Sequence, residues 1–160
     1  MVIRFACQSD IPGMIELLKQ VGEVHHQIRP DLFRSGAQKY DEAALEKLLS
    51  DEKRPILIAE LDGTVAGYAF CIRKSAPASG VMHPRTELYI DDLCVEEALR
   101  GQGIASALYR HVCTVARDMG CGSVTLNVWC GNHSAMGFYE KCGLRPRNVT
   151  MEMVLEESGC

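Results

Sequence analysis

Two glycines that follow an apolar run and precede a long amphipathic segment could bind an anion. They lie in Arg100-Gly101-Gln102-Gly103, directly before Ile104. Glycine permits positive φ and close backbone approach, so successive N–H groups can point at one phosphate while the following helix adds its positive end. The spacing is neither a Walker loop nor a dinucleotide fingerprint, because no Gly-Lys-Ser/Thr follows and Ser106 stands where the last glycine belongs. A flexible turn without a ligand is the alternative interpretation.

Acidic residues crowd the strand that leads into this turn. Strand alternation predicts Glu87 and Asp91 on one face, with Leu88 and Ile90 on the other. A polar face on a central strand is costly to bury unless water or a substrate reaches it. Asp92 would point into the core by the same alternation, unless a β-bulge reverses the pattern. These acids could act as a general base, or attract a cationic substrate while water removes the proton.

The elements that must position these residues follow from apolar periodicity and turn residues. Asp62-Gly63 between two apolar runs predicts a hairpin, and residues 74–85 are predicted to form a loop. In chain order we first predict a strand at 2–5 and a helix from Ser9 or Asp10, which Gly22 and then Arg29-Pro30 end or interrupt. A helix from Asp41 follows, and then strands at 55–60, 64–72 and 87–95. The remaining predicted elements are a helix at 104–119, a strand at 124–128, a short helix from Ser134 to Gly143 and a last strand at 150–155. This order predicts an α/β (α+β) fold, with a mixed sheet and helices on both faces.

Length, composition and charge narrow the class of protein. The 160 residues fit a single domain over 1–160, and 47% hydrophobic residues can form a sizeable core. A net charge of −4 argues against nucleic acid or an acidic membrane as partner. No apolar leader or spanning segment is visible, so we expect a soluble, cytoplasmic protein. The eight cysteines lack C-x-x-C spacing, and we expect reduced thiols and no metal site.

Two motifs resemble those of the GCN5-related N-acetyltransferases, the GNAT superfamily. The segment Arg100–Ala105 matches the signature Q/R-x-x-G-x-G/A and follows an apolar strand end at Leu93-Cys94-Val95. The second segment, NHSAMGFYEKCGL at 132–144, is similar to the block N-x-x-A-x-x-F-Y-x-x-x-G-F. Both motifs occur in the family's order, separated by a helix and a strand, and the element order of the whole chain agrees.

The resemblance implies an enzyme that transfers the acetyl group of acetyl-CoA to a primary amine of a small molecule or peptide, by direct attack in a ternary complex. It implies a mostly antiparallel sheet of six to seven strands whose central strands splay apart, so that the pantetheine arm pairs with one of them. A backbone N–H of that strand would polarise the thioester carbonyl. The implied cofactor-binding residues are Leu93, Cys94, Val95, Arg100, Gly101, Gln102, Gly103, Ile104, Ala105, Ser106, Asn132, Ala135, Phe138 and Tyr139.

The same resemblance suggests roles for three kinds of catalytic group. Tyr139 stands where the family's general acid protonates the leaving thiolate, with a core tyrosine as the alternative. Asn132 stands where an asparagine orients the CoA arm, with a helix cap as the alternative. Similar sequences make Asp91 the first candidate for the general base and Glu87 the second.

The acceptor is less defined than the cofactor. In this superfamily the segment VHHQIRPDLF at 24–33, with His25, His26 and Arg29–Phe33, would form part of the acceptor wall, whereas we favour an exposed polar loop. Polyamines, aminoglycosides, amino acids and protein N-termini all satisfy an acidic site. A homodimer through a sheet edge or the C-terminal strand is compatible with the resemblance. A non-catalytic acyl-CoA-binding or sensing domain is the alternative function, and the retention of Tyr139 and the strand acids favours the enzyme.

Overall fold

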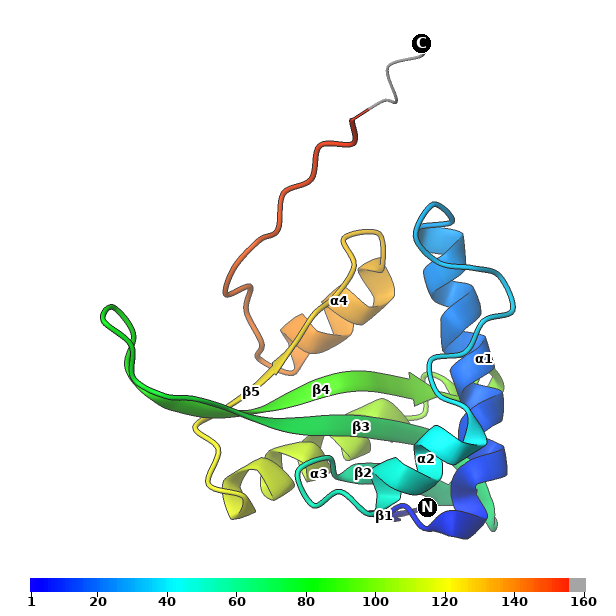
Figure 1. Ribbon diagram of the computed structural model, residues 1–160. Helices are drawn as coiled ribbons and strands as arrows, with labels where there is room; N and C mark the ends of the chain where they lie inside the picture. The colour runs from blue at the N-terminus through cyan, green and yellow to red at the C-terminus, as the bar shows by residue number, and fades with distance from the viewer. Residues whose placement is uncertain (156–160) are drawn as a thin grey trace. The chain divides into compact units, whose positions relative to one another are not determined.

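A computed structural model describes residues 1–155 (Figure 1). The chain divides into two compact units, residues 1–129 and a second unit that begins at Cys130. The first unit holds one five-stranded sheet with the order β1-β2-β3-β4-β5. Its strands are β1 (Val2–Phe5), β2 (Ile56–Leu61), β3 (Thr64–Ala76), β4 (Arg85–Val95) and β5 (Ser123–Leu126). All neighbours pair antiparallel except β4 and β5, which pair parallel.

The mixed, mostly antiparallel sheet is confirmed, but the expected number of six to seven strands is wrong for the described residues. The predicted last strand at 150–155 has no strand pairing. Its apolar side chains are exposed, with Met151 and Met153 both above 80%. Alternation alone therefore does not make a strand there, because a ladder needs a neighbouring strand to satisfy its backbone groups.

Residues 1–155 form four helices, three in the first unit and one in the second, and short 3₁₀ turns at Gln8–Asp10 and Glu97–Leu99 precede two of them. They are α1 (Ile11–Ile28), α2 (Glu42–Leu49), α3 (Ile104–Asp118) and α4 (His133–Lys141). In residues 1–155, none of them has the length and apolar content that a membrane crossing requires. The predicted cap of α2 is confirmed, since the Asp41 side chain accepts a hydrogen bond from the backbone N–H of Ala44.

The first helix ends at the predicted Arg29-Pro30, but the predicted end or break at Gly22 is wrong, because α1 continues through Gly22 to Ile28. The glycine has a different purpose, which is close packing. A Cβ atom at Gly22 would overlap the carbonyl oxygen of Ala37, in the segment that returns from α1 toward α2. A side chain at Gly22 would therefore push this returning segment away from the helix.

Helices lie on both faces of the sheet, as expected. One face packs Leu17 and Leu18 of α1 and Leu45 of α2 against Tyr68 and Phe70. The apolar side of α3 covers the other face; it comprises Ile104, Leu108, Val112, Val115 and Ala116. Figure 1 shows α3 behind the sheet and α1 in front of it. The functional groups of β4 can therefore face either of two separate cores.

The β3–β4 hairpin is longer than predicted. The register of the two strands continues to Ala76 and Arg85, so the loop is shorter than 74–85. Figure 1 shows this hairpin projecting beyond the other strands of the sheet. At its tip, Val81 is 95% exposed.

Candidate active site

The sheet opens between β4 and β5. Their parallel pairing starts at Glu87 with Ser123 and ends at Ile90 with Leu126. The rest of β4, through Val95, continues beside β3 only. The predicted splay of the central strands is therefore present, and it leaves one edge of β4 unpaired within the sheet.

The backbone of the strand end faces this opening. The N–H of Glu96, directly after β4, donates to the carbonyl of Ala66 in β3 at 2.9 Å. Alternate residues of a strand direct their backbone groups to the same neighbour, so Leu93 and Val95 direct theirs away from β3. The Val95 carbonyl accepts a hydrogen bond from Arg100 Nε at 3.2 Å, on that open side. An extended ligand can therefore pair with Leu93 and Val95 as an added strand would.

A β-bulge brings two consecutive carboxylates to the same face of β4. Ile90 packs on the α3 side of the sheet. Asp91 and Asp92 instead bond to Tyr40 and Tyr68, which both belong to the core cluster on the α1 side. A shift in the β3–β4 register at this point supplies the extra residue. Strict alternation is thus wrong for Asp92, and we call Asp91 and Asp92 the acidic pair.

Asp91 is held by a cation and a hydroxyl from the segment between α1 and α2. Lys39 Nζ lies 2.8 Å from Asp91 Oδ2 and 3.1 Å from the Asp91 carbonyl oxygen. Tyr40 Oη donates to Oδ2 at 2.6 Å. Burial by itself raises the pKa of Asp91, but the hydrogen bonds from Lys39 and Tyr40 outweigh it, and the pKa lies below the usual value. Asp91 is therefore a stable anion.

Asp92 has a different environment although it is the next residue. Its Oδ2 accepts a hydrogen bond from Tyr68 Oη at 3.1 Å, and Tyr68 is fully buried. Burial raises the pKa of Asp92 to about 6, against the lowering effects of Lys39 and Tyr68. A carboxylate of this kind can accept a proton near neutral pH.

Glu87 lies apart from the acidic pair along β4. It sits opposite Ser123, where the sheet is closed. Its side chain is largely buried, and its Oε2 lies 4.0 Å from Arg85 Nε. Four residues along a strand separate it from Asp91, a distance of about 13 Å.

The glycine turn forms an open cradle of backbone N–H groups over residues 101–106, whereas the N–H of Arg100, which the sequence adds to this set, donates to the Glu97 carbonyl at 3.3 Å. Gly101 and Gly103 have φ of 80° and 81°, and a Cβ atom at either would contact nothing within 4 Å. The first bond of α3 runs from Ala107 N to the Gly103 carbonyl at 3.0 Å. Helix geometry therefore leaves the N–H groups of the first turn, from Ile104 on, without a carbonyl in their own helix. This cradle, with exposed Arg100 beside it, fits a diphosphate.

An aromatic cluster of His25, Phe33 and Trp129 lies at the far end of α1. The Phe33 ring lies 5.1 Å from His25 and 5.2 Å from Trp129, in an edge-on contact with the latter. The Arg29 guanidinium lies 5.9 Å from the Trp129 ring, and His26 Nδ1 bonds to the Phe33 carbonyl at 2.7 Å. The favoured exposed polar loop is therefore wrong for His25 and Phe33, which are partly buried. Burial, followed by the charge of Lys39, lowers the pKa of His25.

The second motif forms α4 in the second unit. Asn132 Oδ1 accepts a hydrogen bond from the Ala135 N–H at 3.1 Å, so the helix-cap alternative for Asn132 is confirmed and the helix begins at His133, one residue before the predicted Ser134. Phe138 and Tyr139 are both partly buried, and their rings are 5.0 Å apart. The helix is followed by Gly143 at a φ of 91°, as predicted.

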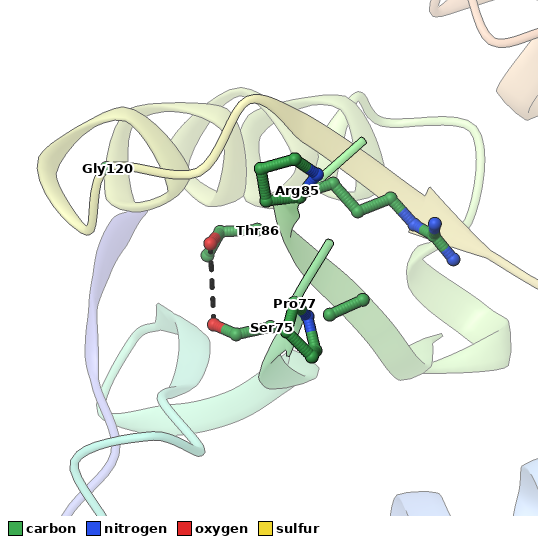
Figure 2. Close-up of a pocket in the computed structure, with 7 residues that line it drawn as sticks. Ser75, Pro77, Arg85, Thr86 and Gly120 are labelled. Carbon is green, nitrogen blue, oxygen red and sulfur yellow. Dashed lines mark hydrogen bonds between the residues drawn. The ribbon is translucent and has the colours of Figure 1, made fainter. Parts of the chain in front are cut away.

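A hollow of about 410 Å³ lies elsewhere in the first unit, at the base of the β3–β4 hairpin. Figure 2 shows Ser75, Pro77, Arg85, Thr86 and Gly120 around it. Ser75 Oγ and Thr86 Oγ1 are 3.4 Å apart across it. Its lining carries no carboxylate, and it borders the start of β4, whereas the acidic pair lies near the end.

Sequence reasoning missed the partners of the acidic pair. Lys39, Tyr40 and Tyr68 each contact one of its carboxylates. Lys39 and Tyr40 come from an irregular segment, for which periodicity gives no position. Tyr68 reads as an ordinary strand residue, and only the bulge in β4 turns Asp92 toward it.

Comparison with known proteins agrees with this geometry. The family model described as the acetyltransferase (GNAT) family matches residues 22–144. N-acetyltransferase family 8 member 2 of Rattus norvegicus is 36% identical over 88 residues, which cover 55% of this chain and 37% of that protein. The chain spans less than two thirds of the first curated relatives it matches, at 62%, 47% and 37% of their lengths.

Solved structures share the fold over almost the whole chain. A mutant of the BH1408 protein of Bacillus halodurans has a TM-score of 0.93 and 29% identity, over 97% of this chain and 99% of that one. The aminoglycoside N-acetyltransferase AAC(6')-Iy, solved in complex with CoA, has a TM-score of 0.69 and 18% identity, over 99% and 100%. The second likeness concerns the fold alone.

Proposed function

Because the chain belongs to the acetyltransferase (GNAT) family, we propose that it transfers the acetyl group of acetyl-CoA to a primary amine of a small molecule or peptide. The transfer is direct, within a ternary complex. One observation carries the proposal: the unpaired end of β4 begins with the acidic pair and is followed by the glycine cradle. Cofactor arm, acceptor amine and diphosphate thus each have a place along one strand and its continuation.

The cofactor-binding residues follow from that order. The N–H groups of the cradle hold the diphosphate, and Arg100 adds a positive charge beside it. Leu93 and Val95 hold the pantetheine arm by pairing along the unpaired edge, and Cys94 between them directs its backbone groups to β3. Acetyl-CoA supplies an activated thioester. The Leu93 N–H, which faces the opening, donates to the oxyanion that forms when the amine attacks.

The acidic pair divides the work on the acceptor. Asp91, a stable anion, attracts the ammonium group of the acceptor, and Asp92 accepts a proton when the amine attacks. This division favours Asp92 as the general base over Asp91, which the sequence favours, and over Glu87, which lies in the closed part of the sheet. The acceptor is therefore a cation before it reacts.

Tyr139 protonates the departing thiolate in this proposal, and Asn132, Ala135 and Phe138 support the cofactor from α4. We expect Tyr139→Phe to lower kcat about 100-fold, the contribution typical of a positioned acid, while the Kd for acetyl-CoA changes little. The assay follows CoA release with a panel of amines, and calorimetry gives the Kd. Tyr109→Phe, in the middle of α3, is the matched control and keeps its turnover.

The same assay separates the enzyme from a non-catalytic acyl-CoA sensor. An enzyme releases CoA faster with at least one amine than with water alone, and the amine gains the acetyl group. Tight binding of acetyl-CoA without acceleration by any amine of the panel would support the sensor. Turnover of Tyr139→Phe equal to that of the unaltered protein would remove Tyr139 from the mechanism.

A further inference from the structure

A primary amine of the protein itself lies at the acidic pair. Lys39 Nζ is 2.8 Å from Asp91 Oδ2 and 3.1 Å from the Asp91 carbonyl oxygen. The contact with the Asp91 carboxylate is the one that the proposed function gives to the ammonium group of an acceptor. Lys39 thus occupies the position of a substrate amine.

The position is close to the proposed site of the thioester. Asp91 is two residues before Leu93, whose N–H faces the opening of the sheet, so the two backbones are separated by about 7 Å along the strand. The Lys39 side chain is 43% exposed and hangs from an irregular segment. A change of side-chain rotamer carries its Nζ over such a distance, because a lysine has four rotatable bonds.

Another lysine has a similar exposure and ion-pair distance but a different place in the fold. Lys19 of α1 is 51% exposed, and its Nζ lies 2.7 Å from Glu16 Oε1. The exposure of the lysine and the length of its ion pair are therefore alike at Lys19 and Lys39, whereas the partner carboxylate is 68% exposed at Glu16 and 15% exposed at Asp91. Of the two, Lys39 is the one that contacts Asp91 at the bulge of β4, directly before Asp92.

From this placement we propose that Lys39 is an intramolecular acetyl acceptor, so that the protein acetylates its own side chain when no better amine is bound. The inference rests on the proposed function. The Lys39 ammonium gives a proton to Asp92, and the neutral nitrogen attacks the carbonyl carbon of the acyl thioester. A C–N bond forms, the C–S bond breaks, the thiolate leaves and takes a proton to become CoA, and the nitrogen loses its extra proton to water. No oxidant or reductant is needed.

The product has a consequence at the site. An acetylated Lys39 carries no charge, so its ion pair with Asp91 is lost. One of the hydrogen bonds that keep the pKa of Asp91 below its usual value disappears with it. The modified protein thus presents an altered acidic pair to the next acceptor.

The test incubates the full chain with acetyl-CoA and no added amine, then measures intact mass and the acetylated peptides. We expect one acetyl group per chain, located at Lys39, with a rate about tenfold or more above that of Lys19. Because the reaction is intramolecular, the fraction modified per minute stays constant when the protein is diluted. Lys39→Arg keeps a cation but loses the modification, Lys19→Arg keeps the modification, and Asp92→Asn slows it at Lys39 only.

Two results would overturn the inference. Equal rates at Lys19 and Lys39, or a rate that falls on dilution, would mean solution chemistry or transfer between molecules. Acetylation of a small amine without modification of Lys39 would reject the inference and leave the proposed function intact. No consumption of acetyl-CoA in either assay would reject both.

Discussion

Neighbouring residues of the same type acquire different chemistry here from the groups that face them. Asp91 meets Lys39 and Tyr40, and its pKa lies below the usual value. Asp92 meets the buried Tyr68, and burial raises its pKa to about 6. When the pKa values of two carboxylates differ in this way, one stays ionised and the other can accept a proton near neutral pH.

Asp92→Asn tests this difference through pH. In the unaltered protein kcat should rise with pH through about 6, as Asp92 loses its proton and becomes able to accept another. The variant should lose this limb and have a kcat at least about 100-fold lower. Pre-steady-state acetyl transfer between pH 5 and 8 measures both. A limb near pH 6 that persists in Asp92→Asn would contradict the assignment, and loss of activity in Asp91→Asn alone would move the base to Asp91.

The same substitution should stabilise the fold at neutral pH. The native pKa of Asp92 lies above its unfolded value, so its stabilising contribution is full below about pH 4 and is lost as pH rises through about 6. A shift of this size corresponds to about 3 kcal/mol. Urea denaturation at pH 7 should therefore give a higher unfolding free energy for Asp92→Asn, with exposed Asp62→Asn as the unchanged control. A lower unfolding free energy for Asp92→Asn would mean that the hydrogen bond from Tyr68 to Asp92 stabilises the protein by more than the buried charge destabilises it.

At the scale of elements, the turn before α3 places a glycine with positive φ directly at the N-terminus of a helix. Gly103 has a φ of 81° and is the N-cap of α3. Gly63 has a φ of 77° in the β2–β3 hairpin and has no helix after it. A Cβ atom at either position would contact nothing within 4 Å. Both glycines therefore need a positive φ, but only Gly103 lies at the proposed diphosphate site.

Alanine at these two positions separates strain from binding. Both Gly103→Ala and Gly63→Ala should lose about 1–2 kcal/mol of unfolding free energy, because an L-residue is strained at this φ. Only Gly103→Ala should raise the Kd for acetyl-CoA, by about tenfold, since its methyl group enters the cradle. Thermal denaturation and calorimetry measure the two effects. Equal Kd values in the two variants would show that the cradle does not hold the diphosphate.

At the scale of the whole molecule, the net charge of −4 is unfavourable for an anionic cofactor. Binding therefore has to come from local groups, the aligned N–H groups of the cradle and Arg100. Ligand binding to the folded state alone stabilises a protein in proportion to the logarithm of ligand concentration. Binding at the cradle should therefore raise the unfolding free energy of the whole chain.

We expect CoA at about 100 times its Kd to add about 2.7 kcal/mol to the unfolding free energy. For a chain of this size the melting temperature should rise by roughly 5 to 10 °C. Differential scanning fluorimetry measures the shift. S-acetyl-pantetheine, which lacks the diphosphate, is the control and should shift it less at equal concentration; equal shifts would argue against the cradle.

Local patterns in the sequence predicted much of the fold. The Asp62-Gly63 hairpin, the cap at Asp41 and the apolar stripe of α3 all have short-range signals, and each is confirmed. The end of the first helix at Arg29-Pro30 is also confirmed, whereas the predicted break at Gly22 is wrong, because this glycine serves a contact with a segment fifteen residues later. The last strand was wrong because exposed alternation does not provide a partner strand.

The candidate site was less predictable than the fold. The glycine cradle and the opening of β4 follow from residues adjacent in sequence. The acidic pair depends on a β-bulge, and the alternation of side chains in the sequence does not indicate where a bulge occurs. Its partners Lys39 and Tyr40 come from an irregular segment about fifty residues away, so only the packed structure brings them to Asp91.

The aromatic cluster has a practical consequence. Trp129 is the only tryptophan of the sequence, and it is 38% exposed. Its indole touches Phe33 and lies beside Arg29, on the segment that leads to Lys39. Indole emission depends on the polarity and mobility of such neighbours. Trp129 is thus an intrinsic fluorophore beside the start of this segment. A rearrangement of the segment can be followed in real time by its fluorescence, without any label.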